Sequence, residues 1–361
     1  MIPHSIFMCC DYIKDDRDKI RLLSVCKDTL TYIHKLELWN KVCMDKILLS
    51  PYLHIFRCVS VSHSSQLSYI TNNIKSVYLS PDYDYTNNNL ILDNVNSLTI
   101  ECGDIIHNHT HCLSIPKFNN LKSLIIPYCW HCGTDTASTS VSSLVISNCG
   151  FNKNNEDIQR RRSKYRCPLL SLLLVNIENL SLLKCIPVIN REVPIGKYGY
   201  KFNVQCYQVE VPYTFVKLKS LIVGDGCLTS GIPSTITNLQ SLTFNDAEFD
   251  LSPTLTSLTY LNFRNSRYES PLPNTFTNLK VLHMGNNYKQ TIPIELRNLE
   301  EITLGEIYTS ASLLKSFTKL TQLTWLCNVG FVRCTPPSLI NLIVRKSYNS
   351  ILPQNVNIIR I

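Results

Sequence analysis

Along the second half of the chain, apolar residues recur with a spacing of three positions followed by a spacing of two. A spacing of three indicates a tight turn-like segment, and a spacing of two indicates a strand with one buried side. Many copies begin with a proline, which fixes φ and removes an N–H group where the chain changes direction. Three clear copies are Ile236, Leu239, Leu242, Phe244; Phe276, Leu279, Leu282, Met284; and Leu296, Leu299, Ile302, Leu304.

The copies recur with a nearly constant period. The next-to-last apolar residue of each copy gives a series with steps of 17 to 21 residues: Leu221, Leu242, Leu261, Leu282, Ile302, Leu323, Leu342 and Ile359. A fixed period of this size predicts a solenoid, in which stacked coils share one core. Coils of about 20 residues leave little room for a multi-turn α-helix, so turns and short 3₁₀ pieces are expected outside the strands. The sequence therefore predicts a mostly β solenoid of the leucine-rich-repeat type.

Weaker copies lie in the first half of the chain. They are Ile74-Val77-Leu79, Val95-Leu98-Ile100, Leu121-Leu124-Ile126, Val141-Leu144-Ile146 and Leu169-Leu172-Leu174. Extra residues near 150–167 and 175–210 are expected to form insertions at one edge of the solenoid. The pattern assigns no coil between 175 and 210. We predict a solenoid over residues 70–361, preceded by a connector and cap over 51–69.

Side chains between the inward strand positions are expected to point outward, because side chains alternate along a strand. Stacked coils would align them into a ladder that mixes an aromatic residue, amides and charges of both signs, as protein-binding faces do. A merely solvated face fits the pattern equally well. Tyr260, Arg264 and His283 are the expected anchors, since aromatic residues and arginines usually carry most of the affinity. The predicted target-binding residues are Tyr260, Asn262, Arg264, His283, Glu301, Gln322 and Arg345.

Residues 1–50 differ from the repeats and are predicted to form a small α-helical unit. The segment DKIRLLSVCKDTL reads as two short helical pieces, and Ile20, Leu23 and Ile33 can form its core. Its other apolar residues exceed what so small a unit can bury alone. An exposed apolar helix face of this kind suggests a protein partner. The alternative is a helical cap that closes the open end of the solenoid.

Both parts resemble known families. The segment GNNYKQTIP (285–293), followed by Leu296 and Leu299, resembles the FNIP repeat, a degenerate leucine-rich repeat of social amoebae and of the giant viruses that infect amoebae. The head resembles an F-box through Ile2-Pro3, the segment LLSVCK (22–27) and Trp39, although Thr29 stands where the motif has an aromatic residue. The resemblance implies a substrate adaptor that joins a Skp-type adaptor protein of a cullin–RING ubiquitin ligase to a protein target. The adaptor-binding residues it implies are Ile2, Pro3, Ile6, Leu22, Leu23 and Val25.

Composition indicates whether the chain can form a core and in which compartment the protein is expected. Of 361 residues, 44% are hydrophobic and 17% charged, so there is enough apolar material for a continuous core. The 16 cysteines, without a secretory signal at the N-terminus, indicate reduced thiols in an intracellular protein. The most apolar run, 169–175 with Ser171 inside it, is too short to span a bilayer. We therefore expect a cytoplasmic protein, in the host cell if it is viral, with no membrane contact.

Candidate chemistry is sparse. Cys102, Cys112, Cys129 and Cys132, with histidines at 107, 109, 111 and 131, have zinc-like spacing. However, Cys129 and Cys149 lie three residues after an inward strand residue, as Asn287 does, which predicts an inward packing position. We expect no metal, no cofactor and no catalytic residue, because no nucleotide-binding or hydrolase motif occurs. The net charge is +8, and the basic run 160–166 is read as a solvated loop rather than a nucleic-acid contact.

Overall fold

The fold is described from a computed structural model of the chain. The residues described are 38, 41–48, 53–80, 83, 92–100, 119–127, 140–147, 176–183, 188–195, 199–205, 211–224, 231–245, 250–266, 268–308, 311–327, 335–348 and 352–361. The chain divides into two compact units. Unit 1 comprises residues 1–142 and 149–152, and unit 2 comprises residues 143–148 and 153–361.

Unit 1 contains parallel strands with a helical turn at their start. Its elements are β1 (Val42–Cys43), α4 (Met44–Ile47), η2 (Leu53–Ile55), β2 (Cys58–Val61), η3 (Ser64–Tyr69), β3 (Ser76–Leu79), β4 (Ser97–Ile100) and β5 (Ser123–Pro127). Each strand pairs in parallel with the next. Gln66 is buried and bonds to Asp45, which ties α4 to η3. The parallel pairing therefore begins within residues 42–69, before the predicted start of the solenoid at 70.

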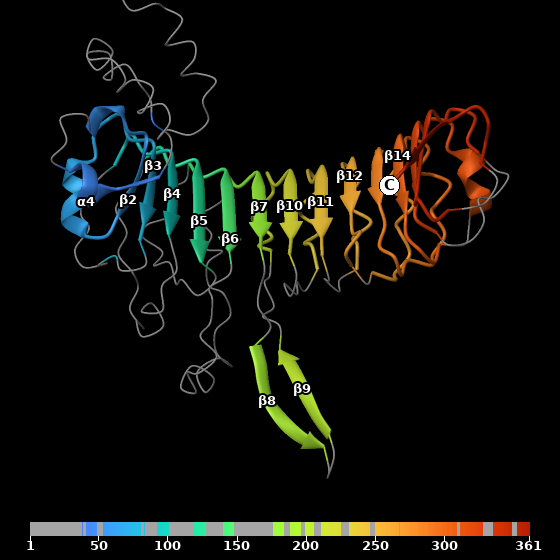
Figure 1. Ribbon diagram of the computed structural model, residues 1–361, viewed down its shortest axis with the longest axis horizontal. Helices are drawn as coiled ribbons and strands as arrows, with labels where there is room; N and C mark the ends of the chain where they lie inside the picture. The colour runs from blue at the N-terminus through green and yellow to red at the C-terminus, as the bar shows by residue number, and fades with distance from the viewer. Residues whose placement is uncertain are drawn as a thin grey trace, which may run out of the picture. The chain divides into compact units, whose positions relative to one another are not determined.

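Unit 2 contains a longer parallel sheet, whose strands lie side by side in Figure 1. Its elements are β6 (Ser143–Ser147), β7 (Asn179–Leu182), β8 (Val188–Ile195), β9 (Gly199–Gln205), β10 (Ser220–Val223), β11 (Ser241–Phe244), β12 (Tyr260–Asn262), β13 (Val281–His283), β14 (Glu301–Leu304), η8 (Ala311–Ser316), β15 (Gln322–Trp325), β16 (Asn341–Val344) and β17 (Asn357–Arg360). The sheet order is β6-β7-β10-β11-β12-β13-β14-β15-β16-β17. This arrangement confirms the predicted mostly β, leucine-rich-repeat-like solenoid.

Backbone hydrogen bonds explain the spacing of three followed by two. The N–H of Phe276 bonds to the carbonyl of Pro273 at 3.4 Å, and the N–H of Leu279 bonds to that of Phe276 at 3.0 Å. These successive turns of the 3₁₀ type return a side chain to the core every third residue. The chain then straightens into β13, where Leu282 points inward and its neighbours do not. Local turn geometry and strand alternation therefore generate the periodic pattern.

The strand register confirms nearly all of the predicted series. Leu221, Leu242, Leu261, Leu282, Ile302, Leu323 and Leu342 are register partners in successive strands. The last step differs, because Leu342 pairs with Ile358 rather than with the predicted Ile359. Both residues are apolar, so the pattern alone could not distinguish them.

The interval 175–210, to which the sequence assigned no coil, contains β7. Leu180 pairs with Leu144 on one side and with Leu221 on the other, so β7 is a full member of the sheet. The rest of the interval includes β8 and β9, which pair only with each other in antiparallel orientation. Figure 1 shows them as a separate two-stranded ribbon. An insertion was predicted here, and the structure describes a hairpin in it.

A buried tyrosine packs inward after β3, β12, β13, β14 and β16, which corrects one sequence interpretation. Asn287 was assigned to an inward position, but it is exposed, and Tyr288 is buried instead. The N–H of Tyr288 bonds to the carbonyl of Gly285, and this tight turn places Asn286 and Asn287 at its tip. Tyrosines at the corresponding position of other coils are also buried: Tyr83, Tyr268, Tyr308 and Tyr348.

Candidate functional site

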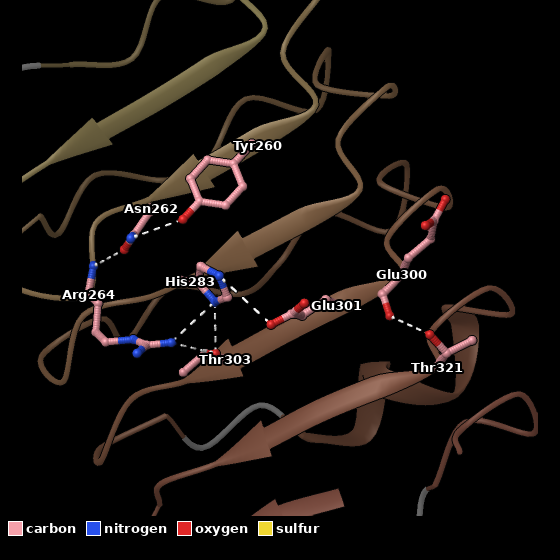
Figure 2. A network of polar contacts seen from close by, with 8 residues as sticks. All are labelled: Tyr260, Asn262, Arg264, His283, Glu300, Glu301, Thr303 and Thr321. Atoms are coloured by element: carbon pink, nitrogen blue, oxygen red, sulfur yellow. Dashed lines mark hydrogen bonds and ion pairs between the residues drawn. The ribbon is translucent and has the colours of Figure 1, made fainter. Parts of the chain in front are cut away.

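The predicted target-binding residues lie on one face of unit 2. We define the outward face as the side chains of β12–β16, and of the two residues after each strand, that point away from the core. Rows of register partners cross this face, and one row consists of Asn262, His283, Thr303 and Thr324. The structure therefore brings the predicted residues of β12, β13 and β14 together, as Figure 2 shows.

Three residues of the β12 coil are linked to one another. The side-chain amide of Asn262 donates to the hydroxyl of Tyr260 at 3.2 Å. The oxygen of the same amide accepts the backbone N–H of Arg264 at 3.1 Å. Asn262 thus fixes the backbone at the end of β12, where the Arg264 side chain begins.

The guanidinium group of Arg264 reaches across β13 to β14. Its Nη2 atom donates to the hydroxyl oxygen of Thr303 at 3.1 Å and lies 3.4 Å from Nδ1 of His283. Figure 2 shows this side chain extended along the ends of the strands. Arg264 therefore links its own coil to the coil of β14, two coils further along the chain.

His283 is the centre of the network. Its Nδ1 lies 2.9 Å from the hydroxyl of Thr303, its Nε2 lies 3.8 Å from a carboxylate oxygen of Glu301, and its ring meets that of Tyr260 edge-on. Burial, and then the Arg264 charge, lower the pKa of His283, while Glu301 partly opposes them. The neutral imidazole with hydrogen on Nε2 fits these contacts, because Nδ1 then accepts from both donors.

Two threonines of the outward face are more buried than alternation alone predicts. Thr303 is 1% exposed and Thr324 is 8% exposed. The side chains of Arg264 and His283 contact the hydroxyl of Thr303 and cover it. The outward face is therefore partly filled by its own long side chains.

The remaining predicted residues lie on the same face in β14, β15 and β16. Glu301 and Gln322 are register partners, and each is partly exposed. Arg345 bonds through Nη2 to the carboxylate of Glu306, a partner that the sequence analysis missed. One signal could have identified it: Glu306 precedes Arg345 by 39 residues, which is also the separation of Arg264 and Thr303. Because 39 residues are about two coil lengths, residues with this separation lie near each other on the stacked coils.

The group Thr303, His283 and Glu301 has the residue types of a hydrolase triad, but the structure argues against that role. A nucleophile must reach its substrate, and Thr303 is almost fully buried under Arg264. The contact from His283 to Glu301, at 3.8 Å, is also longer than a hydrogen bond. The arrangement therefore holds side chains in place and does not prepare a reaction.

Other predicted sites lie outside the described residues. These are the adaptor-binding residues Ile2, Pro3, Ile6, Leu22, Leu23 and Val25, and the cysteine–histidine cluster between 102 and 132. Among the residues that the structure does describe, no group of three His, Cys, Asp or Glu side chains is placed to hold a metal ion. In that same part of the chain, no helix is long and apolar enough to cross a membrane.

Comparisons with known proteins concern the fold. The sequence matches no family model, and a search of curated proteins finds no match. Among solved structures, the circular leucine-rich-repeat protein CroV588 is 18% identical with a TM-score of 0.43, and the alignment covers 84% of this chain and 45% of that protein. A leucine-rich-repeat protein of Leptospira interrogans is 16% identical with a TM-score of 0.42, covering 89% of this chain and 79% of that one. The internalin InlF of Listeria monocytogenes is 13% identical with a TM-score of 0.40, covering 81% of each chain.

Proposed function

We propose that this chain is a protein-interaction scaffold whose outward face binds a protein target. One observation carries the proposal: polar and aromatic side chains from three coils are held together on a partly exposed face by contacts between coils. Side chains that are already ordered lose less conformational entropy on binding. A solenoid also presents such side chains over an extended surface, which suits a large partner.

The finer part of the proposal concerns the N-terminal unit. The resemblance of residues 1–50 to an F-box supports docking to a Skp-type adaptor of a cullin–RING ubiquitin ligase. The outward face would then hold a target near the ubiquitin-charged partner, and ubiquitin transfer would be accelerated by proximity. Such a protein would act in the cytoplasm and need no catalytic residue of its own. The alternative is a scaffold with a helical cap and no role in ubiquitin transfer.

The target-binding part is tested with a triple variant, Tyr260→Ala, Arg264→Ala and His283→Ala. Affinity purification with mass spectrometry first identifies the target, and its affinity is then measured with purified proteins. We expect the triple variant to weaken target binding by at least ~2 kcal/mol, because aromatic and arginine anchors dominate interfaces. Adaptor binding and the fold should remain as in the wild type. Unchanged target affinity would move the site to the insertions near 150–167 or 186–208.

The adaptor part is tested by replacing Ile2 with Asp and Pro3 with Gly. We expect the wild type to bind a purified Skp-type adaptor and this variant to lose that binding, with unfolding of the solenoid unchanged. Wild-type protein that binds no Skp-type adaptor would contradict the F-box interpretation and leave the scaffold with a helical cap.

A further inference from the structure

Arg264 is held in place unusually well for an exposed arginine. Its backbone N–H is fixed by Asn262, and its Nη2 atom is held by Thr303 and His283. These partners come from three successive strands, β12, β13 and β14. An exposed arginine normally loses much side-chain entropy when it binds a ligand. Here the folded protein has already ordered the guanidinium group.

The contacts that hold Arg264 leave most of its donors unused. A guanidinium group carries five N–H donors in a planar fork. Among the described residues, only its Nη2 atom has a hydrogen-bond partner, and no carboxylate lies within ion-pair distance. Arg345 on the same face differs, because Glu306 already neutralises it. Arg264 is thus an ordered cation whose fork can still receive a carboxylate.

The partners of Arg264 are neutral groups that orient it without neutralising it. Thr303 contributes a hydroxyl oxygen, and His283 contributes the Nδ1 acceptor of an imidazole whose pKa is lowered by burial. The acceptor state of Nδ1 is required for the contact, because an N–H there would face the guanidinium. His283 and Thr303 therefore act as positioning residues for Arg264.

The face also indicates the class of ligand. The protein has a net charge of +8, which favours an acidic partner. Arg264 is the one cation in the network of Figure 2 that lacks an acidic partner, whereas a nucleic-acid backbone carries a charge at every phosphate and is bound by several cations. A peptide segment can place one carboxylate at Arg264 and direct other side chains toward Tyr260 or the neighbouring amides.

We propose that Arg264 anchors an acidic, extended segment of the protein target, with His283 and Thr303 holding its guanidinium group in the binding geometry. The proposal rests on the proposed function, since it identifies the kind of target segment that the outward face takes. It assigns to Thr303, which the target cannot contact directly, a role in target affinity.

The test measures binding of two fluorescent peptides to the full chain, hexaglutamate and the neutral hexaglutamine, at about 0.15 M salt, where distant surface charges are screened. We expect hexaglutamate to bind and hexaglutamine not to bind. Arg264→Gln should weaken hexaglutamate binding at least tenfold. Arg297→Gln is the matched control, because Arg297 is also an exposed arginine but lies in a turn away from the outward face. It should change the affinity by less than twofold.

The positioning role has its own variants. Thr303→Val keeps the shape of the side chain and removes the hydroxyl, so it should weaken hexaglutamate binding several-fold although Arg264 is intact. Thr303→Ser restores the hydroxyl and should restore most of the affinity. A purely structural role would predict lower stability for Thr303→Val with unchanged affinity in the folded protein. That result would overturn the positioning assignment.

Other outcomes overturn the anchor assignment. Equal losses in Arg264→Gln and Arg297→Gln would mean that only net charge attracts the peptide. A DNA duplex that binds the wild type and is lost in Arg264→Gln would assign the face to nucleic acid. If hexaglutamate does not bind while Tyr260→Ala still weakens capture of the identified target, the acidic-segment proposal fails and the proposed function stands. If hexaglutamate binds through Arg264 but the triple variant captures the target normally, the proposed function fails instead.

Discussion

Tyr288→Phe removes one oxygen atom from the core of unit 2 and leaves the ring in place. The side chain is 1% exposed, and its hydroxyl accepts the backbone N–H of Leu272 at 3.2 Å. Leu272 begins the same coil that Tyr288 ends, so this bond closes the coil. The ring stacks on Tyr268 and meets Phe263 edge-on, and phenylalanine can keep both contacts. The variant therefore isolates the hydrogen bond.

The expected cost is ~1–3 kcal/mol of unfolding free energy. Leu272 is 4% exposed, and the hydroxyl of Tyr288 is the only hydrogen-bond partner of its N–H among the described residues. Without that partner, a buried donor remains unsatisfied, and such a donor costs about its desolvation penalty of 1–3 kcal/mol. Burying a phenylalanine ring costs less than burying a tyrosine hydroxyl, so the substitution also has a favourable contribution. The net loss of unfolding free energy should therefore fall in the lower half of this range.

Urea denaturation followed by circular dichroism measures the change in unfolding free energy. Hydrogen exchange of the Leu272 amide, followed by mass spectrometry, gives the local effect. A loss of ~1.4 kcal/mol should speed this exchange about tenfold. Tyr213→Phe is the matched control, because that tyrosine is 65% exposed. Its effect should stay within about 0.5 kcal/mol.

If Tyr288→Phe unfolds at the wild-type urea concentration and the Leu272 amide exchanges at the wild-type rate, the tyrosine hydroxyl does not hold the coil closed. The buried tyrosines at the ends of the coils would then contribute only through the packing of their rings.

Three further predictions concern single sites. Gly305→Ala should destabilise the protein by ~1–3 kcal/mol in urea denaturation, since a Cβ atom would overlap the backbone carbonyl of Gly285 and lie 2.6 Å from Cα of Asn286; wild-type stability would mean that the two coils can separate. The lowered pKa of His283 means that the unfolded state binds its proton more readily, so stability should fall as pH drops below about 6.5. Urea midpoints between pH 5 and pH 8, about the range in which histidine titrates, should show a smaller decline for His283→Gln than for the wild type, and equal declines would exclude His283 as the cause. Burial raises the pKa of Cys327 to about 11, from an ordinary value of 9.0, so its contribution to stability should be lost as pH rises from 9 toward 11. Cys327→Ala should show a smaller loss between those pH values, and a loss as large as that of the wild type would assign the effect to the buried tyrosines.

The coil register could be predicted from apolar spacing because each coil folds by local rules. The turns close within three residues, and strand side chains alternate, so the positions of Leu242, Leu261 and Leu282 follow from counting along the chain. The coil at β7 obeys the same spacing through Ile177, Leu180 and Leu182. It was missed because the neighbouring run 169–175 is apolar at almost every position, which conceals the period.

The alternation of strand side chains predicted which residues lie on the outward face, but it did not predict which of them contact one another. Alternation placed Tyr260, Arg264 and His283 on one side of the sheet. It could not show that Arg264 reaches Thr303, or that this contact buries a residue expected to be exposed. Partners from different coils on this face are 18 to 39 residues apart in the chain, and they are selected by side-chain length and rotamer. Apolar periodicity carries no information about either property, so the stacking of coils in three dimensions decided which polar groups meet.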